Sequence, residues 1–150
     1  MSHDRIEREI LIDAAPETVW AVITEPEHIA GWFGDKAELD VRVGGEGLFT
    51  FTDHGVSSAV RIERLDPPSA FSYRWGQGAD NALTPETSTL VEFTLVPTGP
   101  QTRLRVVETG FAALAVPVAE QIRKSEGNVG GWRAELADLE AYVAEGVAIA

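Results

Sequence analysis

The chain has 150 residues, of which 44% are hydrophobic and 24% charged, and its acidic residues outnumber the basic ones to give a net charge of -12. This length and composition predict one globular domain with a buried core and exclude a disordered chain. The negative charge argues against nucleic acid as a partner, and the absence of cysteine excludes disulfides, thiolate metal sites and a cysteine nucleophile.

The N-terminal residues 1–9 are polar and lack the apolar segment of a signal peptide. The longest apolar run, Phe111–Ala119, contains Pro117 and is too short to span a bilayer. We therefore expect a cytoplasmic protein without membrane insertion. The excess of Arg over Lys, with abundant Ala, Gly and Val, is typical of a GC-rich bacterial genome.

The chain begins with a predicted strand and two predicted short helices. Arg5–Ile12 alternates, with its isoleucines on one face, as strands do. Pro16 and Pro26 each fit the first position of a helix, and the second helix must end before Gly31. Both helices thus precede the main run of strands.

From Ala37 the hydrophobic period changes to two. A first hairpin is predicted from Leu39, Val41 and Val43, a turn at Gly44–Gly47, and then Phe49 and Phe51. Further strands are predicted at 56–65, 71–75, 91–95 and 104–108. A polar loop is predicted at 76–87, and loops of this length often line the entrance to a binding site. In the last strand the alternation places Glu108 on the inner face.

A long helix is predicted from Pro117 to about Glu145. One apolar stripe runs along it at steps of three and four residues, formed by Val129, Trp132, Leu136, Leu139 and Val143. Gly127, Gly130 and Gly131 each weaken the helix by about 1 kcal/mol relative to alanine. They either let the helix approach the sheet closely, which we favour, or let its first half move as a lid.

Together these elements predict a single α+β domain with its core at about residues 6–145. A curved antiparallel sheet of about seven strands, in the order strand, two helices, six strands, helix, wraps around the long C-terminal helix. Large rigid aromatics that face small residues such as Ala59, Gly131 and Ala137 leave gaps, so we expect an internal apolar cavity.

Short segments in a fixed order carry a family resemblance: Pro16-Glu17-Thr18-Val19-Trp20, Pro26-Glu27-His28-Ile29 before Trp32-Phe33-Gly34, Leu65-Asp66-Pro67-Pro68 before Tyr73-Arg74-Trp75, Glu108-Thr109-Gly110-Phe111, and Gly131-Trp132. From Ile6 to about Val143 the chain resembles the SRPBCC superfamily, the START and Bet v 1-like helix-grip proteins. The branch it resembles is similar to the C-terminal domain of the activator of Hsp90 ATPase (AHSA1-like).

This resemblance implies a helix-grip fold with an apolar cavity between sheet and helix. It implies no fixed catalytic set, because members bind lipids, sterols or polyketides, cyclise polyketides, or have no known ligand. Eukaryotic Hsp90 activators have an additional N-terminal domain that makes much of their chaperone contact, and a chain of this length has no room for it, which argues against a chaperone role.

The candidate ligand-binding residues are the inward aromatics and their neighbours. Any one of them could instead be packed core. The set is Trp32, Phe33, Phe49, Phe51, Ser58, Val60, Phe71, Tyr73, Trp75, Phe93, Glu108, Trp132 and Leu136.

Glu108 is the most informative polar candidate, because an inward carboxylate must be hydrogen-bonded and tends to have a raised pKa. Its partners could be Tyr73, Ser58 or a tryptophan indole; alternatively it satisfies loop amides or pairs with an arginine, which we favour. An enzymatic alternative uses Glu108 as general acid or base and Tyr73 as proton donor.

Other residue patterns point to no metal, triad or phosphate site. His3, His28 and His54 lack the helical spacing of a zinc hydrolase, and we expect them at the surface. Asp53, His54, Ser57 and Ser58 are neighbours in a turn and strand, with no nucleophile elbow, so we expect no triad. Gly44, Gly45 and Gly47 join two strands and do not precede a helix, as a phosphate loop would.

The sequence therefore favours a non-enzymatic protein that binds a small hydrophobic molecule, lipid-like or polyketide-like, without cofactor or metal. One alternative is a cyclase, aromatase or hydrolase that uses Glu108 and Tyr73. A second is a protein-interaction module similar to the Hsp90 activators. No sequence feature indicates an oligomeric state.

Overall fold

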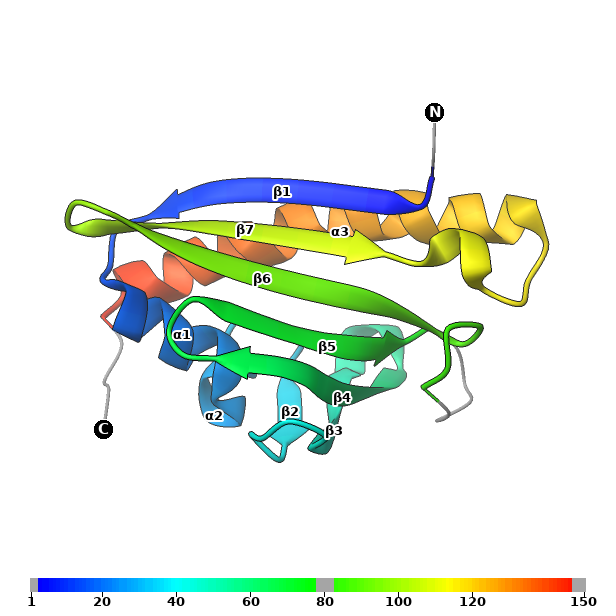
Figure 1. Cartoon of the computed structure of the whole chain (residues 1–150), viewed down its shortest axis with the longest axis horizontal. Coiled ribbons are helices and arrows are strands. Elements are labelled where there is room, and N and C mark those ends of the chain that lie inside the picture. The colour runs from blue at the N-terminus through cyan, green and yellow to red at the C-terminus, as the bar shows by residue number, and fades with distance from the viewer. Residues whose placement is uncertain (1–2, 78–82, 147–150) are drawn as a thin grey trace.

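In a computed structural model that describes residues 3–77 and 83–146, one antiparallel sheet wraps around a long helix (Figure 1). Within the described residues the strand order is β1-β7-β6-β5-β4-β3-β2. The strands are β1 (Arg5–Ile12), β2 (Lys36–Leu39), β3 (Glu46–Phe51), β4 (Val56–Asp66), β5 (Ala70–Gly76), β6 (Ser88–Thr98) and β7 (Gln101–Thr109). The predicted α+β class and element order are confirmed.

The helices lie on one side of this sheet (Figure 1). They are α1 (Pro16–Thr24), α2 (Pro26–Ile29) and α3 (Val118–Ala144), with short 3-10 turns η1 (Thr52–His54) and η2 (Phe111–Ala113). In Figure 1, α3 runs behind β1 and β7, and its C-terminal end lies near α1. No helix in the described ranges has enough length and apolar character to span a membrane.

The core lies between the inner face of the sheet and the apolar stripe of α3. Trp132, Leu136 and Leu139 are buried on the helix, and Val129 and Val143 pack against the core at its edges. The sheet contributes the other half of the core. Alternation along its strands explains this, since the inward residues of β4 and β6 are buried while most of their neighbours are partly or fully exposed. The predicted helix stripe is confirmed.

The first hairpin differs from its prediction. Strand β2 ends at Leu39, and Val41 and Val43 are exposed in the connection to β3. The chain turns back early because the Gly45 amide donates to Arg42 O, and the Gly44 amide donates to Ile62 O of β4. A Cβ on Gly45 would lie 1.9 Å from Asp40 O, so this tight turn requires glycine.

The helix glycines do not serve the close approach that we favoured from the sequence. A Cβ placed on Gly127, Gly130 or Gly131 would meet no atom within 4 Å. Ala137 is exposed, and Ala59 lies between the buried residues Ser58 and Val60 and hence on the other face of β4. Of the small residues expected to leave room inside the fold, Gly131 alone lies beside a cavity.

Candidate functional site

A cavity of about 730 Å³ lies between the central part of α3, the η1 turn, and the adjoining ends of β4 and β5. Its volume is in the range typical of small-molecule sites. The lining residues come from segments far apart in the sequence: Phe33, Phe51, His54, Gly55, Val56, Ser57, Ser58, Trp75, Gly76, Gln77, Lys124, Asn128, Gly131, Trp132 and Glu135. Residues 78–82 of the predicted entrance loop lie outside the described residues.

Four aromatic side chains form the apolar wall of this cavity. The Phe33 ring stacks on Trp132 at a centroid distance of 5.4 Å, and lies 5.6 Å from Trp75 and 5.2 Å from Phe51. Trp75 also contacts Trp132 at 6.1 Å, and its indole nitrogen has no hydrogen-bond partner among the described residues. The wall is thus continuous and offers ring faces and edges to a ligand.

Phe33 reaches this position because the chain turns sharply after α2. Gly34 has φ +67°, and a Cβ there would lie 2.4 Å from Thr50 O of β3. Both observations require glycine at this position. The turn places Phe33 between the helix layer and the sheet.

The deeper aromatic residues are packed core. The space that Trp32, Phe49, Tyr73 and Phe93 share with α1 and α2 admits no water-sized molecule. Phe71, Val60 and Leu136 are also buried and lie away from the cavity. The candidate set of the sequence analysis therefore divides: Phe33, Phe51, Ser58, Trp75 and Trp132 line the cavity, and the remaining members stand behind it.

Glu108 lies behind the cavity wall and is fully buried on β7. Its carboxylate accepts hydrogen bonds from Thr89 Oγ1 at 2.5 Å, Trp132 Nε1 at 2.8 Å, and Asn128 Nδ2 at 3.1 and 3.2 Å. Burial raises the pKa of Glu108, while these three donors act in the opposite direction.

The partners of Glu108 correct our preferred interpretation of this residue. The described residues include no arginine or loop amide bonded to its carboxylate, and all its partners are side chains. A tryptophan indole was among the expected partners. Trp132 and Asn128 both line the cavity, so Glu108 fixes two wall residues from behind.

Tyr73, the second residue of the enzymatic alternative, is also buried in the core. Burial raises its pKa well above the ordinary value, and the negative charges of Glu108 and Glu135 add to this rise. No hydrogen bond joins Tyr73 to Glu108 in the described part of the chain, and neither residue lines the cavity. The geometry presents neither group to a molecule bound there.

Sequence reasoning missed most of the polar lining of the cavity. Lys124 Nζ donates to Gln77 O at 2.9 Å, and Asn128 Nδ2 lies 3.4 Å from Gln77 Oε1. Glu135 is partly buried, and burial raises its pKa to about 7, with a smaller contribution from Asp138. The signal that could have identified Lys124, Asn128 and Glu135 is their three- and four-residue spacing with Gly131 on the helix.

The histidines occupy three different settings. His54 is exposed at the cavity mouth, and no described hydrogen bond joins it to Ser57 or Ser58, whereas Ser57 Oγ pairs with Thr50 Oγ1 at 3.0 Å. His3 Nε2 lies 3.0 Å from Gln121 Oε1. The expectation that every histidine lies at the surface is wrong for His28, whose side chain is 12% exposed.

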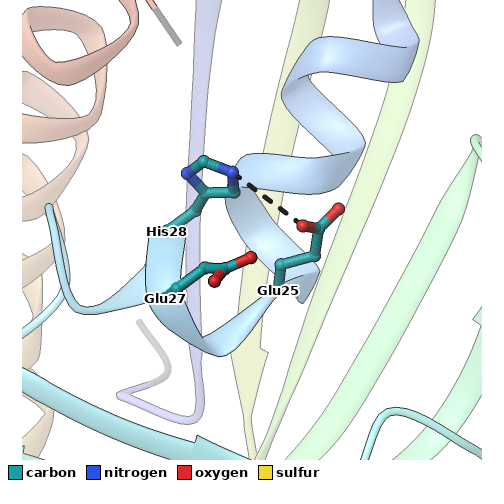
Figure 2. A group of neighbouring side chains, drawn as sticks. All are labelled: Glu25, Glu27 and His28. Atoms are coloured by element: carbon teal, nitrogen blue, oxygen red, sulfur yellow. Dashed lines mark ion pairs between the residues drawn. The ribbon is translucent and has the colours of Figure 1, made fainter. Parts of the chain in front are cut away.

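His28 belongs to a cluster with Glu25 and Glu27 at the junction of α1 and α2 (Figure 2). Its Nε2 lies 3.9 Å from Glu25 Oε1, and its Nδ1 lies 2.8 Å from the Tyr142 hydroxyl of α3. The ligand atoms of the three side chains lie within 4.8 Å of one another, and Glu27 is exposed. The ion pair and the contact with α3 account for the position of His28.

Residues 13–144 match the family described as Activator of Hsp90 ATPase homolog 1-like protein. The chain belongs to this family. Its fold is shared by ligand binders, polyketide cyclases and Hsp90 activators. No curated protein matches the chain.

Solved structures show the same fold. The protein MLL2253 from Mesorhizobium loti is 27% identical, with a TM-score of 0.80 over 96% of this chain and 99% of its own. DynU16, a putative protein in the dynemicin biosynthetic locus, is 22% identical, with a TM-score of 0.76 over 95% of this chain and 48% of its own. An Hsp90 activator from Plasmodium falciparum is 16% identical, with a TM-score of 0.72 over 94% of this chain and 96% of its own.

Proposed function

We propose that this protein binds a small, mainly hydrophobic molecule in the cavity beside α3 and does not convert it chemically. The observation that carries the proposal is the cavity of about 730 Å³ with a wall formed by Phe33, Phe51, Trp75 and Trp132. Apolar surface in contact with water is unfavourable, by about 25 cal/mol for each Å². A molecule that covers these rings would therefore bind favourably and stabilise the fold.

The positions of Glu108 and Tyr73 argue against the enzymatic alternative that uses this pair, and so support binding. Glu108 and Tyr73 are buried behind the wall, and the hydrogen bonds that Asn128 and Trp132 donate to Glu108 hold these two wall residues in place. A general acid or base needs hydrogen-bond reach to the reacting group, directly or through one water. Neither residue lines the cavity, so we assign Glu108 a positioning role.

The glycines of α3 provide a matched test of this proposal. Gly131 lines the cavity and Gly130 does not, while both are exposed helix residues with open space where a Cβ would stand. Gly131→Phe should fill part of the cavity, and Gly130→Phe should place the same side chain outside it. Both replace one helix glycine by the same residue, so their effects on helix propensity are similar.

Binding can be measured with N-phenyl-1-naphthylamine, a neutral dye that fluoresces in apolar sites, and by native mass spectrometry of protein from its own host. We expect the wild type and Gly130→Phe to bind the dye equally, and Gly131→Phe to bind it at least about tenfold more weakly. Equal binding by the two variants would place the ligand elsewhere. A wild type that binds no dye and carries no ligand from its host would refute the proposal.

A further inference from the structure

Glu135 is a partly buried carboxylate on the cavity wall without a basic partner. No lysine or arginine among the described residues forms an ion pair with it, and the Gly34 backbone is the neighbour that lowers its pKa. The other charged group on the α3 side of the cavity is compensated, because Lys124 Nζ lies 2.9 Å from Gln77 O and 4.0 Å from Glu120 Oε1. The uncompensated charge of the lining is therefore negative.

The aromatic wall adjoins this carboxylate. Glu135 follows Trp132 by three residues on α3, a spacing that makes side chains neighbours on a helix surface. Phe33, which precedes Gly34, lines the same cavity as Glu135 and stacks on Trp132. Phe51 and Trp75 complete the set of rings around the same space. Aromatic faces attract cations, and the attraction strengthens where water is excluded.

We propose that the hydrophobic molecule bound in this cavity carries a positively charged amine or quaternary ammonium group, which Glu135 and the surrounding aromatic rings recognise. This inference rests on the proposed function and adds the charge of the ligand. The net charge of -12 acts in the same direction, because it raises the concentration of cations near the surface.

The ionisation of Glu135 links cation binding to pH. The titratable groups that act on Glu135 or share its cavity are Asp138 and Lys124 of α3, His54 of η1, the buried Tyr73, and Glu108 behind Trp132. With a pKa of about 7, the Glu135 carboxylate is mainly protonated at pH 6 and mainly ionised at pH 8. Cation affinity should rise by up to about tenfold between these two values.

Three compounds that share the naphthylmethyl group and carry head groups of different charge test the inference: naphthylmethyl-trimethylammonium, naphthylmethanol and naphthylmethanesulfonate. We expect calorimetry at pH 8 to show the ammonium compound binding at least about tenfold more tightly than the other two. Glu135→Gln should remove this preference and its pH dependence, and should change the affinity for neutral naphthylmethanol far less. Asp138→Asn removes one exposed carboxylate of the same helix and should retain most of the preference.

His54→Gln serves as a second control, because histidine changes charge in the same pH range. Its pH dependence should match that of the wild type. If naphthylmethanol binds as tightly as the ammonium compound, or Glu135→Gln keeps the preference, the charge inference is wrong and the proposed function stands. A preference for the sulfonate that Lys124→Met abolishes would also overturn it. If none of the three compounds binds, the proposed function fails as well.

Discussion

Replacing Trp132 with alanine should be one of the most destabilising changes in this domain. The side chain is 2% exposed, stacks on Phe33, contacts Trp75 and Phe93, and donates a hydrogen bond to the buried Glu108. Truncation of a buried tryptophan lowers the free energy of unfolding by about 3–5 kcal/mol. For a domain of this size, each kcal/mol corresponds to about 2–4 °C, so we expect a loss of about 6–20 °C in Tm.

The contribution of the hydrogen bond can be separated from that of the ring. Trp132→Phe keeps an aromatic ring and removes the donor to Glu108, and losing a hydrogen bond to a charged group lowers stability by about 1.5–3 kcal/mol. Trp32→Phe is the matched control, because its Nε1 donates to a neutral acceptor, Val22 O, at 2.9 Å. That change should lower stability by about 0.5–1.5 kcal/mol for the bond.

Urea unfolding followed by circular dichroism measures all three variants. If Trp132→Ala unfolds at the wild-type midpoint, α3 is not held against the sheet through this residue, and the described packing is refuted. If the two phenylalanine variants lose the same free energy, Glu108 does not hold Trp132 in the way we describe.

Substitutions at the glycines and at Glu135 have defined outcomes. Gly127→Ala and Gly130→Ala should each raise the free energy of unfolding by about 1 kcal/mol, because a Cβ meets no atom there, and an unchanged urea midpoint would contradict this. Gly34→Ala should lower it by about 1–3 kcal/mol, because φ is +67° and the Cβ would lie 2.4 Å from a backbone oxygen; wild-type stability would contradict the described turn. The pKa of Glu135 is raised from its ordinary 4.5 to about 7, so its contribution to stability is complete below pH 4.5 and is lost as pH rises through 7. Glu135→Gln should therefore stabilise the free protein more at pH 8 than at pH 5. Asp138→Asn, the control, should show a smaller difference in stabilisation between the two pH values. An equal effect of Glu135→Gln at both pH values would argue against a raised pKa.

Periodicity was sufficient to predict the elements and the inward direction of key residues. Alternation along the last strand predicted that Glu108 faces inward, and the stripe through Trp132 predicted which face of the helix meets the sheet. These are local properties, because the side-chain direction follows from position in a strand or helix. The turn at Gly45 was not predictable in this way, since it depends on a contact with Asp40 and on the neighbouring strand β4.

The position of the cavity depends on packing that no periodic pattern contains. Phe49 and Phe51 face the same side of one strand, yet Phe49 is packed core and Phe51 lines the cavity. Phe49 shares its space with Ile23 of α1 and Ile29 of α2, whereas Phe51 lies with Trp75 and Trp132 on the cavity wall. Glu135 belongs to the polar side of the helix by sequence, and it becomes a cavity residue only because the turn at Gly34 brings Phe33 beside it.

The pairing of β1 with β7 has a consequence for how the chain folds. Arg5 pairs with Thr109 and Ile12 with Thr102, so the first strand to leave the ribosome has its neighbour about 100 residues later in the chain. Closing so long a loop is entropically unfavourable, and topologies dominated by such distant pairs fold slowly. Until β7 has been synthesised, the apolar face of β1 with Ile6 and Ile12 has no strand beside it, and nascent chains that stop before residue 101 should be especially prone to aggregate.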